Sequence, residues 1–214
     1  LHSEFSTLLR WLGALTEDAV HARPRLCVYY ALASVLAGCP LDAAQSHVEA
    51  AEEAEGTAAG EVTAFRALIA TYRGQREQSI ELSERALELL PQDNLFFRSF
   101  TAGFLGLNYL YSGDVEDGMR AFREAVRVSD RTGNVTIGVL ARCHLAELAG
   151  LQGYLRETER LYKEALRVGT DDRGQRRPVA GTTYEASLAA ADEEDPRLDR
   201  QFRRLAEHVL ADFP

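Results

Sequence analysis

Apolar residues along this chain recur at spacings of three and four, the pattern of amphipathic α-helices. Runs of alternating β-branched residues are missing from the sequence, so helices are the only element that the pattern predicts. Glycine or proline interrupts it at short intervals, for example at Gly74 and Gly113, and a short polar turn precedes Pro24. The predicted helices cover residues 5–15, 24–37, 41–54, 59–73, 75–90, 94–112, 114–132, 134–152 and 154–169. Short connections between helices of similar length predict antiparallel neighbours.

A repeat underlies this pattern. Three alanines that are 39 and 40 residues apart mark equivalent points: Ala86, Ala125 and Ala165. A glycine stands 12 residues before each of them, at Gly74, Gly113 and Gly153, and a small residue stands seven before that, at Ala67, Gly106 and Ala146. Small residues where two helices touch and glycine at the turn predict an α-solenoid of helical hairpins. Such a fold binds other molecules and rarely does chemistry.

Large residues accompany the small ones at fixed places in each unit. One unit has Leu105, Gly106, Tyr109, Gly113, Phe122 and Ala125, and the next has Leu145, Ala146, Gly153, Tyr162 and Ala165. This arrangement resembles the tetratricopeptide repeat (TPR), whose first helix carries a large and a small residue and whose second helix carries an aromatic residue and alanine. The unit at 60–92 fits less fully, because Ser79 and Ser83 replace apolar residues, and the unit at 25–54 is weaker still.

A closer resemblance covers about residues 5–169. The segments that carry it are Leu8–Leu26 (LLRWLGALTEDAVHARPRL), Leu41-Asp42-Ala43-Ala44, Arg66-Ala67, Tyr72-Arg73-Gly74 and Ala86-Leu87-Glu88-Leu89-Leu90-Pro91. They resemble the helical-repeat region of large MalT-like regulators, which are ATP-dependent transcriptional activators of the LuxR type. The resemblance implies a region between an ATPase module and a helix-turn-helix that receives an inducer and takes part in self-association. Some signalling kinases share a similar region.

The pattern predicts one helical-repeat domain over residues 1–214. Its parts are an N-terminal lead-in at 1–23, four helical hairpins at 24–169, and a linker with capping helices at 170–214. Within the last part, 179–191 is a candidate helix, and Asp195 with Pro196 is expected to start a final one. Because the chain begins at Leu1 rather than methionine, we expect a processed chain or a piece of a larger protein.

Charge and motifs narrow the function. The 214 residues carry a net charge of -9, so we expect no direct contact with nucleic acid, which requires clustered Lys and Arg. The sequence contains neither a G-x-x-x-x-G-K-[ST] motif nor a basic helix pair, so this segment lacks the ATPase and DNA-binding parts of the family. No apolar run or basic leader predicts a membrane span or export, and we expect a cytoplasmic location.

The sequence shows no catalytic or metal-binding pattern. Three cysteines at unpatterned spacing, Cys27, Cys39 and Cys143, are typical of reduced thiols. Cys143 and His144 are adjacent on a predicted helix, so their side chains diverge, and a core cysteine beside a surface histidine is expected. His2, His21, His47 and His208 lack ligand spacing for zinc. We therefore predict no catalytic residues, no cofactor and no metal site.

The first helix of each hairpin is expected to line the inner surface of the solenoid. The candidate groove residues at that phase are Glu61, Thr71, Tyr72, Phe100, Leu107, Tyr111 and Glu147. Aromatic rings with hydroxyls and carboxylates suit a small-molecule inducer or a partner protein helix. The predicted function is a non-catalytic, ligand-sensing and protein-interaction segment of a MalT-like transcriptional regulator. The alternatives are a general TPR scaffold for protein-protein interaction and the repeat region of a signalling kinase.

Overall fold

The computed structural model describes residues 2–53 and 58–175, and these fold into helices with no strand among them. The helices are α1 (His2–Leu12), α2 (Glu17–His21), α3 (Pro24–Leu36), α4 (Leu41–Glu53), α5 (Ala59–Tyr72), α6 (Arg76–Leu89), α7 (Leu95–Ser112), α8 (Val115–Thr132), α9 (Val135–Leu151) and α10 (Leu155–Val168). Contacts divide the chain into two compact units, Leu1–Asn108 (unit 1) and Tyr109–Pro214 (unit 2), and the division falls within α7.

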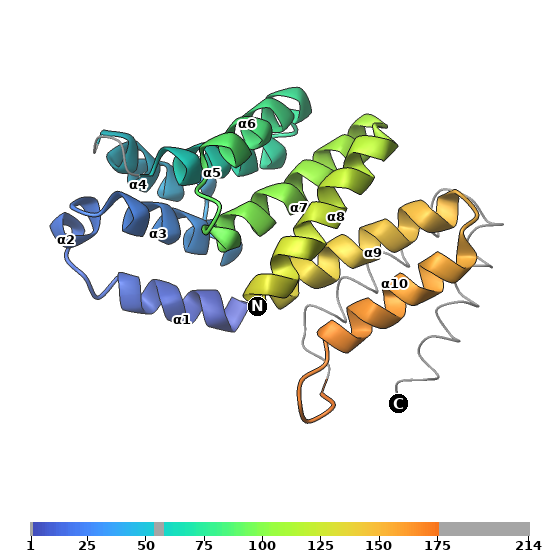
Figure 1. The fold of residues 1–214 in the computed structure, drawn as a ribbon. Coiled ribbons are helices and arrows are strands. Elements are labelled where there is room, and N and C mark those ends of the chain that lie inside the picture. Colours follow the sequence, from blue (N-terminus) through green and yellow to red (C-terminus); the bar gives the residue numbers. More distant parts are fainter. Residues whose placement is uncertain (1, 54–57, 176–214) are drawn as a thin grey trace. The chain divides into compact units, whose positions relative to one another are not determined.

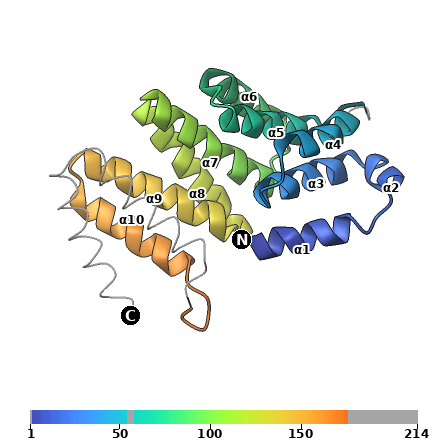
Figure 2. The ribbon, with the colours of Figure 1, turned by 180° about the vertical axis from the view of Figure 1, so that it is seen from behind.

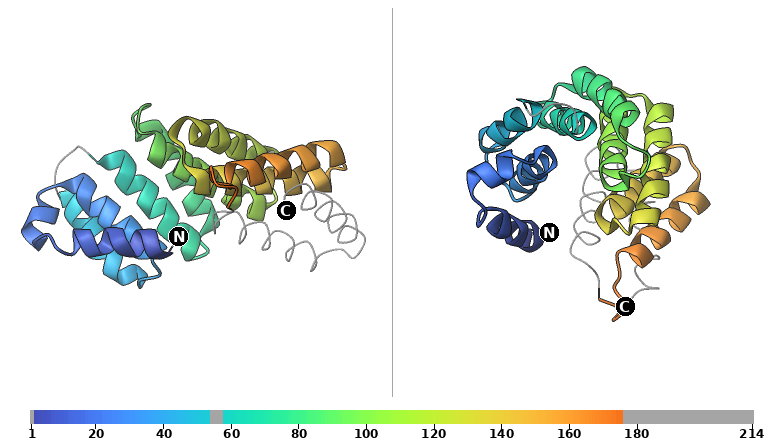
Figure 3. Two further views of the ribbon diagram at one scale, coloured as in Figure 1. Left: turned by 90° about the horizontal axis from the view of Figure 1, so that it is seen from below. Right: turned by 60° about the vertical axis from the view of Figure 1, so that its left-hand side comes forward.

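Unit 1 contains two helical hairpins, α3 with α4 and α5 with α6, and α4 also packs on α5 (Figure 1). The short helices α1 and α2 pack on α3 (Figure 3). Where Pro91 prevents α6 from continuing, Arg98 of α7 donates hydrogen bonds to the carbonyls of Leu87 at 2.8 Å and Leu90 at 3.1 Å. These bonds satisfy backbone acceptors that the end of a helix leaves open.

A polar network replaces apolar packing inside the α5–α6 hairpin. The Ser79 hydroxyl donates to the Ala67 carbonyl at 2.8 Å and lies 2.7 Å from the Thr71 hydroxyl. The side-chain amide of Asn108, which is buried in unit 1, donates to the Thr71 hydroxyl at 2.9 Å and to Ser79 at 3.1 Å. Serine therefore stands here because its hydroxyl reaches the backbone of the facing helix, which explains the departure from an apolar residue at this point of the repeat.

The repeat glycines stand at turns that require a left-handed backbone. Gly74 has φ +71° and Gly153 has φ +81°, a region that residues with a side chain seldom adopt. The residue after each glycine donates its N–H back into the helix, Gln75 to the Ala70 carbonyl and Tyr154 to the Ala149 carbonyl. This is the hydrogen-bond pattern of a glycine-terminated helix. The glycine therefore fixes where the first helix of the hairpin ends.

Unit 2 contains α8, α9 and α10, with α9 packed against both of the others (Figure 2). The repeat alanines Ala146 and Ala165 are buried, as are Ala67 and Ala86 in unit 1. Arg142 of α9 is buried as well, and its guanidinium donates to the Asp130 carboxylate of α8 at 2.7 and 2.8 Å. Its Nε lies 3.7 Å from Glu164 of α10. One buried cation thus connects all three helices.

The fold is the predicted all-α arrangement of TPR-like hairpins. Two elements differ from the prediction. The first helix covers His2–Leu12 and ends before Gly13, instead of covering 5–15. Residues 17–21 form α2 instead of part of a polar turn, because the Thr16 side chain accepts from the Ala19 N–H and two acidic residues occupy the first turn. The predicted capping helices at 179–191 and from Asp195 lie outside the described residues. Among the helices of the described part, none combines the length and apolar character needed to cross a membrane.

Candidate functional site

Five of the seven candidate groove residues belong to unit 1, and two of these five are enclosed by other side chains. Glu61 is buried, where it accepts from Asn94 at 2.9 Å and pairs with Arg25 at 3.1 Å. Phe100 is 4% exposed and packs between the rings of Phe96 and Phe104. As they stand, neither side chain presents surface to a ligand. Glu61 connects α5 to α3 and to the start of α7 through these two partners, whereas the ring partners of Phe100 lie on its own helix, α7.

The remaining candidates differ in exposure. The Thr71 hydroxyl is hydrogen-bonded to the side chains of Ser79 and Asn108. The Leu107 side chain is half-buried. Tyr72 is 54% exposed at the end of α5, and in unit 2 Tyr111 is 64% exposed at the end of α7. Glu147 of unit 2 is partly buried and lies 2.8 Å from the His144 ring. Whether any of the seven residues binds a ligand stays a prediction.

A concavity lies in unit 2, between α8 and α10, with α9 as its floor. Its volume is about 960 Å³. We call it the α8–α10 groove and define it by its principal lining residues: Met119, Arg123 and Val126 of α8; Leu145, Ala149 and Gln152 of α9; and Tyr154, Glu157, Arg160 and Leu161 at the start and middle of α10. Its floor is apolar, because Leu145 and Ala149 are buried beneath it. Tyr154, at the turn, is 62% exposed.

The arginines on the two walls of this groove differ in whether a carboxylate compensates their charge. On α10, Arg160 donates to Glu157 and also pairs with Glu164 at 2.5 Å, so its charge is compensated within the helix. The hydrogen bond from Arg160 holds the pKa of Glu157 below its usual value, and the charge of Arg123 acts in the same direction. Arg123, on the α8 wall, makes no ion pair or hydrogen bond with any described residue.

Unit 1 has a groove at the equivalent place of the repeat, between α4 and α6 above α5, with a volume of about 270 Å³. We call it the α4–α6 groove. Alignment on the buried alanines Ala51 and Ala125, Ala67 and Ala146, and Ala86 and Ala165 gives the equivalent positions. On the α4 wall, Gln45, Glu49 and Glu52 are equivalent to Met119, Arg123 and Val126 of α8. On the floor, Arg66, Ala70 and Arg73 are equivalent to Leu145, Ala149 and Gln152 of α9. On the α6 wall, Gln75, Gln78 and Leu82 are equivalent to Tyr154, Glu157 and Leu161.

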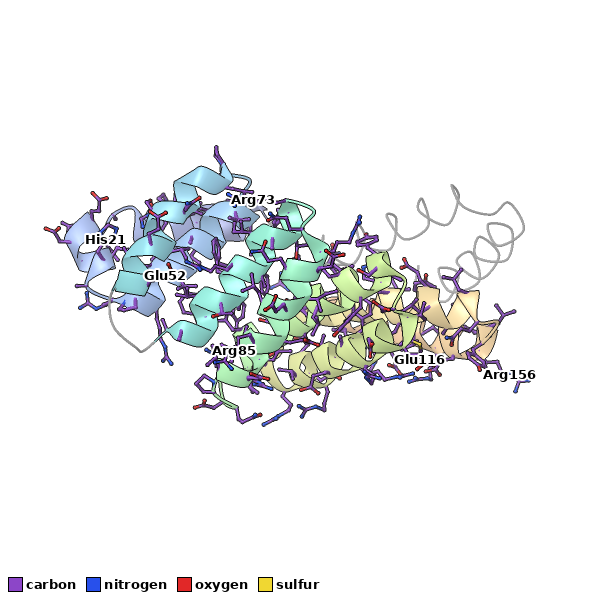
Figure 4. The ribbon with its side chains drawn as sticks, turned by 90° about the horizontal axis from the view of Figure 1, so that it is seen from above. His21, Glu52, Arg73, Arg85, Glu116 and Arg156 are labelled. Carbon is purple, nitrogen blue, oxygen red and sulfur yellow. The ribbon has the colours of Figure 1, made fainter. Side chains whose placement is uncertain are left out.

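The two grooves share a backbone plan and differ in chemistry. In the α4–α6 groove Arg66 donates to Glu52 at 2.6 Å, so an ion pair joins α5 to α4 across the groove (Figure 4 labels Glu52 and Arg73). The equivalent residues in the α8–α10 groove are Leu145 and Val126, which are apolar. Arg123 stands where the other groove has Glu49. The α8–α10 groove is therefore the larger, more apolar and more basic of the two.

Among the residues that the structure describes, no cysteine thiol pairs with a histidine as an activated nucleophile. Burial raises the pKa of the Cys143 thiol to about 12, so it is protonated at neutral pH. Its neighbour His144 is partly buried rather than on the surface as expected, because its ring stacks on Phe122 with centroids 5.1 Å apart. Within residues 2–53 and 58–175, no three His, Cys, Asp or Glu side chains gather closely enough to hold a metal ion.

The repeat phase of the sequence does not indicate the α8–α10 groove, because that phase predicts binding on the first helices of the hairpins. This groove is formed mainly by second helices, α8 and α10, with one first helix as its floor. The available signal was Tyr154, a large residue directly after the turn glycine Gly153, where unit 1 has Gln75. Only packing shows that Tyr154 and Arg123 face the same groove, since 30 residues separate them.

Comparison with known proteins agrees with this architecture. The family model of the MalT-like TPR region matches residues 60–191, which is more than half of the chain. The match begins in α5 and includes both the Ser79 network and the whole α8–α10 groove. No curated protein matches the chain significantly. On the evidence of the family match and of the repeated hairpins, the chain belongs to the family of MalT-like TPR regions.

Proposed function

We propose that this chain is the ligand-sensing and protein-interaction segment of a MalT-like transcriptional regulator, and that it is not itself catalytic. The observation that carries the proposal is the α8–α10 groove, a concavity of about 960 Å³ within the part of the chain that matches the family. Ligand pockets of small molecules have volumes of roughly 300–1,000 Å³ and mostly apolar walls with a few polar groups. The volume of the groove lies in this range, and its floor is apolar.

The interaction role has separate support. Leu151, Tyr154 and Leu155 are large apolar residues that are exposed around the α9–α10 turn. Contiguous exposed apolar side chains rimmed by polar ones mark places where a partner docks. An inducer in the groove would contact Tyr154 and Leu155, which line it. A ligand and a partner protein would therefore share residues, and one would affect the binding of the other.

A thermal-shift screen of metabolites on the whole chain tests the proposal. An inducer present at 100 times its dissociation constant is expected to stabilise the folded chain by about 2.7 kcal/mol. Each compound that raises the melting temperature is then titrated against Tyr111→Ala and Glu147→Ala, which probe the first-helix surface, and against Leu155→Ser, which probes the α8–α10 groove. If a broad screen gives no stabilising compound, ligand sensing is wrong and the alternative of a general protein scaffold is preferred.

A further inference from the structure

We propose that the α8–α10 groove binds an amphipathic organic anion, whose carboxylate, phosphate or sulfonate pairs with Arg123 and whose apolar part contacts Tyr154 and the apolar floor. This inference rests on the proposed function, because it names the class of ligand that the sensing segment takes. It differs from the groove expected from the sequence, which lies on the first helices and contains no cation.

The apolar half of the site comes from three helices. Leu145 and Ala149 of α9 form the floor, and Leu161 of α10 and Val126 of α8 stand on either side. Tyr154 and Leu155 are exposed at the rim, at 62% and 45%. Covering exposed apolar surface of this kind is favourable in proportion to the area removed from water. A ligand that lies on the floor and contacts Tyr154 would gain this contribution.

The charged half of the site is Arg123. The charge of Arg123, on α8, lowers the pKa of Glu157, on α10, so the guanidinium acts across the groove. Glu157 is already held by two hydrogen bonds from Arg160 and therefore does not compensate Arg123 fully. Arg156, at the start of α10 and labelled in Figure 4, is a second cation. It lines the groove and has no ion pair or hydrogen bond among the described residues. Guanidinium groups bind carboxylates and phosphates through paired hydrogen bonds.

The α4–α6 groove is an internal comparison in the same chain, because the acidic and basic residues of its lining are equal in number. There the cation Arg66 is paired with Glu52, and Glu49 stands at the position of Arg123. That groove is smaller, at about 270 Å³, and its lining holds two acidic and two basic side chains. In the α8–α10 groove the corresponding acidic residues are replaced by Arg123 and Val126. An anion is thus expected to bind in unit 2 and not at the equivalent place in unit 1.

The first experiment measures binding of 8-anilinonaphthalene-1-sulfonate, an aromatic anion, by its fluorescence on the whole chain. Arg123→Gln removes the charge and keeps a long polar side chain, and Leu155→Ser removes exposed apolar surface without emptying a core. We expect Arg123→Gln to weaken binding about tenfold, the effect of losing a charge-assisted hydrogen bond. The control is Glu49→Gln, at the equivalent position of the α4–α6 groove, which is expected to bind like the parent. Circular dichroism verifies that each variant is folded.

The second experiment separates charge from apolarity. Decanoate and decan-1-ol contain the same number of carbon atoms and differ in charge, so each is used to displace the probe. Decanoate is expected to compete about tenfold better than decan-1-ol on the parent chain and no better on Arg123→Gln. Equal competition on the parent, or parent-like probe binding by Arg123→Gln, overturns the anion site. If neutral metabolites stabilise the chain while the anions do not depend on Arg123, this inference fails and the proposed sensing function stands.

Discussion

The guanidinium of Arg142 in α9 donates two hydrogen bonds to the carboxylate of Asp130 in α8, at 2.7 and 2.8 Å. Arg142 is buried whereas Asp130 is half exposed, so the cation depends on this carboxylate for most of its compensation. Glu164 of α10 lies farther away, 3.7 Å from the Arg142 Nε. Among the described residues of unit 2, Arg142 is the buried charge, and the stability of the unit is expected to depend on its partner.

Asp130→Ala is expected to lower the free energy of unfolding by about 1–3 kcal/mol, because it leaves a buried guanidinium with one distant carboxylate. Urea titration followed by circular dichroism measures the loss. The matched control is Asp117→Ala on the same helix, which removes an exposed ion pair with Arg120 and is expected to cost about 0–1 kcal/mol. Equal losses in the two variants would show that Arg142 does not rely on Asp130.

Gly60→Ala is expected to destabilise unit 1 although alanine favours helices. A Cβ at position 60 would lie 2.9 Å from the Leu90 backbone nitrogen and 3.1 Å from the Leu89 carbonyl carbon. Backbone atoms cannot move aside as the end of a side chain can, so we expect a cost of about 1–3 kcal/mol, as for overpacking elsewhere. Thermal melting measures it. Gly138→Ala is the comparison, since its Cβ would meet side-chain atoms of Arg142 and Ser129 at 3.3 and 3.4 Å, and it should cost less.

Acid is expected to destabilise the N-terminal part of unit 1 through His47. Burial lowers the pKa of His47, the charge of His21 lowers it further, and Glu17 opposes both. The two rings are 5.7 Å apart, the His47 ring lies 4.2 Å from that of Tyr30, and within the described part of the chain His47 Nδ1 and His21 Nε2 are buried without hydrogen-bond partners. The folded state thus binds fewer protons than the unfolded state, whose histidine pKa is about 6.5.

This difference in bound protons determines how the stability of the folded state changes with pH. Stability is at its full value above about pH 6.5 and falls as the pH drops through this value toward the lowered pKa of His47, where the loss levels off. Melting temperatures at several values between about pH 7.5 and pH 5 measure the slope. His47→Phe retains a ring against Tyr30 and removes the titration, so its slope should be smaller. A parent and variant with the same slope would assign the acid sensitivity to other groups.

The three thiols are expected to react at different rates with Ellman's reagent. Burial raises the pKa of Cys143 to about 12 and also raises the pKa of Cys27, whereas Cys39 is partly exposed. Because the thiolate is the reactive form, one fast equivalent from Cys39 is expected in the folded chain and three in guanidinium chloride. Cys39→Ser should abolish the fast phase. Fast reaction of a second thiol would show that a buried cysteine is opened by local unfolding.

The helices and their hairpins could be predicted from the sequence because the signals are local. Apolar spacing identifies each helix, and Gly74 or Gly153 identifies the turn that follows it. The helix α2 was missed because its five residues are too few to show a period, and only the hydrogen bond at Thr16 reveals it. Family membership was also predictable, since the match covers the repeats that the sequence already showed.

The candidate site was less predictable because it depends on which side chains meet across helices. Glu61 and Phe100 have the right phase to face a surface, yet Arg25, Asn94 and the neighbouring rings enclose them. Phase along one helix does not show what a second helix covers. For Arg123 and Tyr154 the reverse holds. Each has the sequence context of an ordinary surface residue, and only the packing of α8, α9 and α10 places both in one groove.

The two grooves occupy equivalent places two repeats apart, and many of their lining residues lie on helix surfaces outside the buried interior of each hairpin. The lining of each groove can therefore be changed separately. Replacing Glu49, Glu52 or Arg66 alters the surface of the α4–α6 groove and leaves the buried core beneath it filled. The pair of grooves therefore offers a template for grafting: transferring the arginine and apolar positions of unit 2 onto unit 1 is expected to give unit 1 the anion site that we propose for unit 2.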